Sequence, residues 1–308
     1  MQSFEKYRKS NLEQNVHYVL NTWSIPRDLF GPLSKYVRSN VNHLEILLEL
    51  LPNKPWCPMD VSKNPNITWE FVQRNPDKLW DWYDLTANPN ITWEIIQNNP
   101  DKPWNRSGFS HNPNITWKII KNHPEIPWRW RPISENPNIT WEIVRQNTDV
   151  HWDWTGLSMN PNITWEIVRN NPDKPWNWYG LSDNPSITWD IIQRHPDMPW
   201  KWESISKNPN ITWDIVQRNP KKPWTWRYLS RNPNITWDII QRNSMLWTWE
   251  NVTQNPNVTW DIIKSHPKEP WNWYYISLNP NLTWEIVYDN KEKDWSWLWL
   301  SSNEFKGD

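Results

Sequence analysis

The sequence predicts an all-α protein, an elongated α-solenoid of 24-residue repeats. Asn-Pro pairs recur every 24 residues, with one spacing of 23 between Asn232 and Asn255, and such a period indicates units that stack on their neighbours. Each unit has a Thr at a helix N-cap position, with aliphatic residues one before it and four after it. Opposite charges three or four residues apart, such as Asp190 and Arg194, meet on a helix. A β-solenoid is the alternative, because Ile-Thr-Trp-Glu-Ile-Val partly alternates.

The repeat divides the chain into four segments. Residues 1–39 are predicted to form an N-terminal helical cap. Residues 40–63 are a degenerate first repeat, in which Glu45 replaces the first Trp, and residues 64–302 hold ten Trp-rich repeats. The C-terminal tail, residues 303–308, starts in register with Asn303 and then departs from the pattern. Atypical units at both ends are expected where a solenoid needs caps.

The unit at residues 160–183 shows the expected order of elements. Thr164 is predicted to cap a short α-helix that begins at Trp165 and stops before a proline. The amide of Asn160 is expected to bond the backbone of the adjoining turn and so tie units together. A shorter helix or 3₁₀ turn is predicted to begin at the proline before Trp176 and to carry Trp178. Most Trp residues are predicted to form stacked ladders in the core.

Composition favours a folded protein despite low aliphatic content. The mean hydropathy is -0.93, but 32 residues are Trp, and each buried Trp removes roughly 150–250 Å² from water. A net charge of -1 makes nucleic acid an unlikely partner. The polar start at Met1–Gln14 lacks the core of a signal peptide, and no long apolar run predicts a membrane span. We therefore expect an intracellular, cytoplasmic protein.

The residues that resemble catalytic or metal-binding groups are explained by the repeat. His123, His195 and His266 occupy one repeat position three units apart, so they cannot converge on one metal ion. Acids such as Glu166 recur at the start of a helix, where they complement its dipole. With one Cys and five Gly, the chain has neither a Cys-rich metal site nor a Gly-rich phosphate loop. We predict no enzymatic activity, no cofactor and no metal.

At one position of the repeat, nine units carry an Asn-x-Thr triplet that matches the N-glycosylation pattern, but the helix cap explains these triplets better. Ser186 breaks one triplet while Thr188 keeps the cap. The triplets begin at Asn66, Asn90, Asn114, Asn138, Asn162, Asn210, Asn234, Asn257 and Asn281.

One basic residue per unit near the end of the first helix forms the clearest candidate binding surface. Stacked about 10 Å apart, these residues would form a positive stripe for an acidic protein surface or peptide. Intrahelical pairing and dipole complementation are the alternative. The basic stripe comprises Arg74, Lys121, Arg145, Arg169, Arg194, Arg218, Arg242 and Lys264.

Two repeat families resemble this sequence. The 24-residue leucine-rich repeat variant, with alternating α and 3₁₀ helices, matches at Asn160-Pro161, Val168 and Leu181-Ser182. It has Thr-Pro where this chain has Ile163-Thr164-Trp165 and is far less Trp-rich. Over residues 40–303, the Trp content also resembles the tryptophan-repeat proteins of entomopoxviruses and other large DNA viruses. That resemblance implies a virus-encoded protein in the host cytoplasm, and neither resemblance implies an enzymatic activity.

These observations predict a non-catalytic repeat scaffold that mediates protein–protein interaction. The alternatives are a carbohydrate-binding module with exposed Trp, a structural component of a virion, and an F-box-like ubiquitin-ligase adaptor. The last rests on Ile25–Leu29 and Tyr36-Val37, which are similar to the start of an F-box. The binding face, the handedness of the superhelix and the oligomeric state remain open.

Overall fold

The computed structural model describes residues 42–243 and 246–306, and this part of the chain is helical without any strand. The all-α solenoid is thereby confirmed over the β-solenoid. The segment predicted as an N-terminal cap, residues 1–39, lies outside the described residues, as do the positions resembling an F-box.

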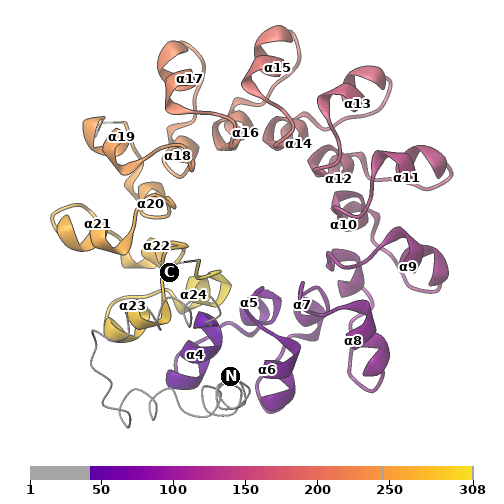
Figure 1. Cartoon of the computed structure of the whole chain (residues 1–308), viewed down its shortest axis with the longest axis horizontal. Coiled ribbons are helices and arrows are strands. Elements are labelled where there is room, and N and C mark those ends of the chain that lie inside the picture. Colours follow the sequence, from indigo (N-terminus) through magenta and orange to yellow (C-terminus); the bar gives the residue numbers. More distant parts are fainter. Residues whose placement is uncertain (1–41, 244–245, 307–308) are drawn as a thin grey trace, which may run out of the picture.

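Each unit contributes one helix to an outer layer and one to an inner layer (Figure 1). The outer helices are α4 (His43–Leu50), α6 (Trp69–Arg74), α8 (Trp93–Asn98), α9 (Trp117–Asn122), α11 (Trp141–Gln146), α13 (Trp165–Asn170), α15 (Trp189–Arg194), α17 (Trp213–Arg218), α19 (Trp237–Arg242), α21 (Trp260–Ser265) and α23 (Trp284–Asp289). The inner elements are α5 (Pro58–Lys63), α7 (Trp82–Thr86), the 3₁₀ helix η2 (Gly108–His111), α10 (Trp130–Glu135), α12 (Trp154–Met159), α14 (Trp178–Asp183), α16 (Trp202–Lys207), α18 (Trp226–Leu229), α20 (Trp249–Val252), α22 (Trp273–Ile276) and α24 (Trp297–Ser302).

The outer helices form as the sequence predicts. In α13 the Thr164 hydroxyl accepts a hydrogen bond from the Ile167 backbone N–H at 3.5 Å, which satisfies one of the free donors at the helix start. Ile163, before the cap, and Val168, four residues after it, are both buried, as the hydrophobic staple requires. The helix ends with Asn171 as its C-cap, directly before a proline.

The predicted start of the inner helices is wrong. The helix begins at Trp178, with Asn177 as N-cap, and not at Pro175. The Pro175-Trp176 segment is instead held in a tight connection, in which the Trp176 backbone N–H donates to the Lys174 carbonyl at 2.8 Å and its indole N–H to the Asn171 carbonyl at 2.8 Å. The proline therefore supports an extended connection and not a first helical turn.

Buried side-chain amides and hydroxyls join each unit to the one before it. The Asn160 amide donates to the carbonyls of Ser134 and Asn136, at 2.9 Å each. The Ser158 hydroxyl accepts from the Asn177 backbone N–H of the next unit at 2.8 Å. Because Asn160 and Ser158 are fully buried, these bonds satisfy backbone groups that would otherwise be costly to bury. The predicted tie between units through the leading Asn is confirmed.

Tryptophans fill the space between the layers. Trp176 packs against two rings of the preceding unit, Trp141 at 6.0 Å and Trp154 at 4.9 Å, the latter edge-to-face. Such tilted and edge-to-face pairs are the arrangements that aromatic rings prefer. The Trp ladder predicted for the core is therefore present, as a zigzag that alternates between layers.

The units taper toward the inner layer, and this taper curves the array. At the inner contacts the residues are small: a Cβ added to Gly156 would lie 2.5 Å from the Arg131 carbonyl, and one added to Gly180 would lie 3.1 Å from Ser158 Cβ. Small residues let neighbouring helices approach closely, whereas the Trp rings keep the outer layer wide. The inner helices consequently lie side by side and the outer helices splay apart (Figure 1).

The curvature closes the array into a ring, a feature that the repeat pattern did not predict. Helix α24 packs on α5, and α23 packs on α4 (Figure 1). The Ser301 hydroxyl accepts from the Cys57 backbone N–H at 2.9 Å, which repeats the contact of Ser158 with the next unit although the residues are 244 apart. Trp56 meets Trp297 edge-to-face at 5.0 Å, as Trp-Trp pairs do within the array. The seam is thus another repeat interface.

One unit of the ring is assembled from both ends of the chain. The C-terminal Asn303 accepts, through its backbone carbonyl, a hydrogen bond from the Asn64 amide at 2.9 Å, in the place of a preceding Asn-Pro turn. Phe305 donates its backbone N–H to the Asn303 side chain at 2.7 Å and is 4% exposed. Residues 303–305 therefore supply the turn of the unit whose outer helix is α4, near the other end of the sequence.

Candidate interaction surfaces

The basic stripe lies on the outer, convex side of the ring. Six of its eight residues form ion pairs with nearby acids. Most pair within their own helix, as Arg218 does with Asp214 at 2.9 Å and Arg242 with Asp238 at 3.0 Å. The paired residues are Arg74, Arg145, Arg194, Arg218, Arg242 and Lys264. Lys121 and Arg169 have no ion pair within the described ranges.

Two features make the basic stripe less suited to binding an acidic partner: most of its residues are ion-paired, and the outer helices that carry it spread apart. Apart from Arg74 with Glu45, each pair is largely exposed, and exposed pairs contribute roughly 0–1 kcal/mol and cancel charge locally. Because the outer helices fan apart (Figure 1), the basic groups are not stacked as closely as a straight array would place them. The geometry favours intrahelical pairing, and an acidic partner for the stripe stays a prediction.

The Trp residues do not form an exposed row. Every Trp within residues 42–243 and 246–306 is buried or half-buried. The repeated histidines also pack on this ladder: His195 lies 4.7 Å from Trp165, and His266 lies 5.0 Å from Trp237. These rings are therefore used for packing between units.

The Asn of each of these Asn-x-Thr triplets donates hydrogen bonds to the backbone of the preceding unit of the ring. The Asn162 amide donates to the carbonyls of Pro137 at 2.7 Å and Ile139 at 3.1 Å in the preceding unit. A glycan on this nitrogen would compete with those bonds. Ser186, the exception, donates its hydroxyl to the Ile163 carbonyl at 2.9 Å and preserves one contact.

The inner layer exposes a second surface, here called the inner belt. It consists of the residues two before and two after the buried aliphatic or aromatic residue of each inner helix, such as Tyr179 and Asp183 around Leu181. Two residues correspond to about 200° around a helix, so these side chains point away from the core and toward the ring axis. The belt comprises Met59, Lys63, Tyr83, Ala87, Ser107, His111, Arg131, Glu135, Thr155, Met159, Tyr179, Asp183, Glu203, Lys207, Arg227, Arg231, Glu250, Gln254, Tyr274, Leu278, Leu298 and Ser302, none of which is buried.

The belt varies from unit to unit inside a nearly constant framework. The two residues that follow one another at the centre of each inner helix are an apolar residue and Ser or Thr, both buried, in all eleven units. The flanking belt positions change from Tyr and Asp on α14 to Arg and Arg on α18 and to Leu and Ser on α24. Sequence reasoning missed this surface, although the signal was available as variation at two fixed positions of the repeat.

The belt also carries apolar groups that a surface without a partner rarely exposes. The described residues have seven exposed large hydrophobic side chains, and five of them belong to the belt. Those five are Met59 (55% exposed), Met159 (43%), Tyr179 (56%), Tyr274 (45%) and Leu298 (43%). Grouped apolar exposure of this kind is typical of interaction sites.

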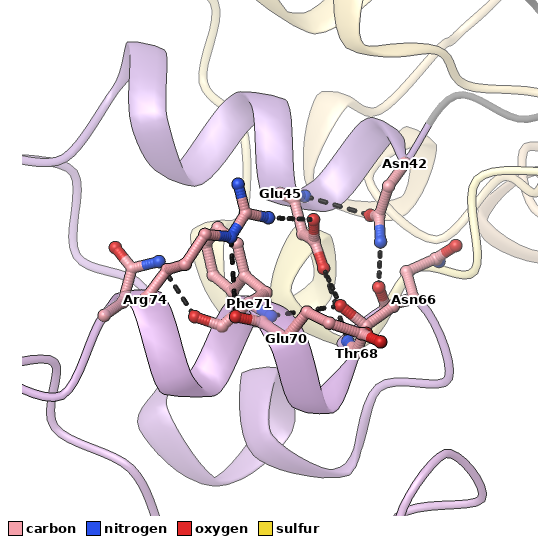
Figure 2. Close-up of polar contacts among 8 residues, drawn as sticks. Asn42, Glu45, Asn66, Thr68, Glu70, Phe71 and Arg74 are labelled. Atoms are coloured by element: carbon pink, nitrogen blue, oxygen red, sulfur yellow. Dashed lines mark hydrogen bonds and ion pairs between the residues drawn. The ribbon is translucent and has the colours of Figure 1, made fainter. Parts of the chain in front are cut away.

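The first unit holds a polar cluster in place of a Trp contact (Figure 2). Glu45 accepts a hydrogen bond from the Thr68 hydroxyl at 2.9 Å and lies 3.9 Å from the Arg74 guanidinium. Burial raises the pKa of the Glu45 carboxyl from 4.5 to about 6, and the bonds from Thr68 and the charge of Arg74 oppose this shift. The cluster joins α4 to α6 and has a structural explanation.

No constellation with evident chemistry stands out elsewhere in the described ranges. Groups of three or more His, Cys, Asp or Glu that could hold a metal ion are absent there. A depression beside α15 and α16 is lined by Trp189, Met198, Trp200 and Lys222 among others, and its lining contains neither acid nor histidine. No helix within the same ranges is long and apolar enough to cross a bilayer.

Comparisons of the chain with known protein families, with curated proteins and with solved structures find no match.

Proposed function

We propose that this protein is a non-catalytic scaffold that binds other proteins through the inner belt of a closed helical ring. The observation that supports this function most directly is the contrast between buried and exposed positions of the inner helices. The buried pair keeps its character in every unit, whereas the belt residues differ in size, charge and polarity. Packing explains the constant positions, whereas the contacts that variable positions make with one another, such as the ion pair of Arg131 with Glu135 at 3.3 Å, lie on the exposed surface.

The geometry of the belt suits recognition. A curved solenoid presents a concave surface along which several units contact one partner. Tyr and Arg, the residue types enriched at binding hot spots, occupy belt positions on α7, α10, α14, α18 and α22. A carbohydrate-binding role has less support, because it requires solvent-facing Trp and the described Trp residues are packed. Neither the virus-encoded origin that the resemblance implies nor a cytoplasmic location has support beyond the sequence.

The experiment that tests this function compares the two surfaces in one affinity purification. The bait is the full chain in three forms: unchanged, with Arg169→Glu, Arg194→Glu and Arg218→Glu on the outer helices, and with Tyr179→Ser, Arg227→Glu and Leu298→Ser in the belt. We expect the outer variant to retain the proteins that bind the unchanged chain and the belt variant to lose them. The reverse result would assign binding to the basic stripe. Unchanged binding by both variants would show that neither surface is the binding site.

A further inference from the structure

The belt is divided into sectors of different chemistry, and two of them, one basic and one apolar, border the ring opening on either side of α20. Around α16 and α18 lies a basic sector, defined as the belt residues Lys207, Arg227 and Arg231 together with Lys201, the N-cap of α16. Helices α22, α24 and α5 carry an apolar sector, defined as Tyr274, Leu278, Leu298 and Met59. Figure 1 shows α16 across the ring from α24 and α5, whereas α18 and α22 are separated by α20.

The cations of the basic sector outnumber the acids beside them. Unlike most of the outer arginines, none of the four takes part in an ion pair within the described part of the chain. The two lysines lie over aromatic rings instead: the Lys201 ammonium is 5.0 Å from the Tyr179 ring centre, and the Lys207 ammonium is 4.4 Å from that of Tyr228. Two acids lie beside them: Glu203 on α16, which accepts a hydrogen bond from the Tyr228 hydroxyl at 2.7 Å, and Asp183 on α14, whose carboxyl interacts electrostatically with Lys207. The sector keeps an excess of positive charge.

The apolar sector spans the seam between the two ends of the chain. Tyr274, Leu298 and Met59 are each more than 40% exposed and come from three consecutive inner helices. Trp299 lies 6.2 Å from the Tyr274 ring and extends the aromatic surface. Because this exposure costs free energy in water, the sector is suited to an apolar face of a partner.

The size of the ring limits what can touch both sectors. Eleven inner helices at about 9 Å spacing form a circle about 32 Å across between helix axes. Subtracting a helix diameter of about 10–12 Å leaves an opening of about 20 Å. One α-helix, itself about 10–12 Å wide, can approach both sectors there, whereas a folded domain of 100 residues, with a radius of gyration of about 13 Å, is too large.

We infer that the inner belt binds an amphipathic acidic segment of another protein, with its acidic face on α16 and α18 and its apolar face on α22, α24 and α5. This rests on the proposed function and names the partner chemistry for the same surface. The chain's own residues 1–41 do not fit this description, because they contain three acidic residues against six Lys and Arg. A second copy, with net charge -1, offers no strong acidic complement either.

Two labelled peptides of 18 residues test the inference with the full chain. One is an amphipathic helix of Glu and Leu, and the other replaces every Glu with Lys; binding is followed by fluorescence anisotropy. We expect the Glu/Leu peptide to bind, to bind more weakly as salt rises, and to bind at least tenfold tighter than the Lys/Leu peptide.

Variants locate the two faces. Two double variants are made: Arg227→Glu with Arg231→Glu, and Tyr274→Ser with Leu298→Ser. Each should weaken binding of the Glu/Leu peptide at least tenfold, because all four side chains are exposed in the belt. The matched control, Arg194→Glu with Arg218→Glu, makes the same charge change on the outer layer and should alter binding less than twofold. Circular dichroism checks that each variant folds.

The outcomes separate this inference from the proposed function. Equal or tighter binding of the Lys/Leu peptide, absence of Glu/Leu binding, or equal losses in the outer control would each overturn the acidic amphipathic partner. If captured proteins nevertheless depend on the belt in the purification described above, the scaffold function stands and only the partner chemistry is wrong.

Discussion

Removing the C-terminal turn should open the ring while leaving the rest of the array folded. Truncation after Ser302 deletes the carbonyls of Asn303 and Glu304, which accept hydrogen bonds from Asn64 and Asn66 at 2.9 Å each. It also deletes Phe305, which is 4% exposed. The turn of the composite unit would then be missing, and α4 would lose one side of its support.

The structure sets the free energy that the seam should lose on truncation. Burial of a Phe side chain contributes roughly 2 kcal/mol, and each of the two hydrogen bonds contributes about 1 kcal/mol net. Their sum, about 4 kcal/mol, corresponds to a roughly thousandfold increase in the open population of the seam. Contacts between α24 and α5, including Cys57 with Ser301, remain but are no longer flanked by the turn.

Hydrogen exchange followed by mass spectrometry measures this directly. Amides of α4 and α24 should exchange up to about a thousandfold faster in the truncated chain, whereas amides of α13 and α14, on the far side of the ring, should change little. Truncation after Lys306 keeps Phe305 and is the matched control. If α4 and α24 already exchange as quickly as frayed ends in the unchanged protein, or if truncation after Ser302 changes nothing, the ring closure is wrong.

Three further predictions concern the seam, the Asn ladder and Glu45. Ser301→Cys should form an intramolecular disulfide with Cys57 on oxidation, seen as a mobility shift, whereas Ser182→Cys, at the same repeat position in a distant unit, should not. Asn184→Ala should lower the free energy of unfolding by about 2–4 kcal/mol in denaturant titrations, because two buried carbonyls lose their donor, whereas exposed Asn170→Ala should cost under about 0.5 kcal/mol. Because the folded pKa of Glu45, about 6, lies above its unfolded value of 4.5, its stabilising contribution is present below pH 4.5 and lost as the pH rises through 6. At pH 8 the free energy of unfolding of the Glu45→Gln variant should therefore exceed that of the unchanged protein by up to about 2 kcal/mol, and at pH 4 the two should differ little. An equal difference at both pH values would contradict the assigned burial of Glu45.

The local elements could be predicted from sequence because each is set by neighbouring residues. Thr164 and Asn160 have roles that follow from helix capping and from amide geometry, and the structure confirms both. The start of the inner helix was misjudged because Pro175 fits a first helical turn as well as an extended connection. The indole bond from Trp176 to Asn171 decides between them, and that bond depends on the turn between the layers.

The site was harder to predict because it depends on curvature. Each unit carries the same local signals whether the array is straight or closed, so the sequence pointed to a charged row on the outer helices. In the structure this row is convex and largely ion-paired, as Arg194 is with Asp190 at 3.0 Å. The belt became recognisable only once the ring placed its variable positions around a common axis.

Closure changes the meaning of the atypical ends. In an open solenoid the terminal units must cover an apolar face toward water. Here the terminal units cover each other, so the departures at His43 and Phe305 form contacts across the seam and are not polar caps. His43 lies 6.2 Å from the Phe305 ring and accepts the backbone N–H of Trp284 across that seam.

Closure also fixes the number of units. Eleven units that complete a circle must each turn by about 33° on average. Inserting or deleting one unit would leave that much rotation uncompensated at the seam, where the Asn303 turn must meet Asn64 within hydrogen-bond distance. A residue missing from an outer connection, as between Asn243 and Trp247, does not alter this angle, because the Asn255 amide still reaches the Ser230 and Asn232 carbonyls at 2.9 and 3.2 Å. The inner contacts therefore set the size of the ring, and with it the width of any segment that the belt can hold.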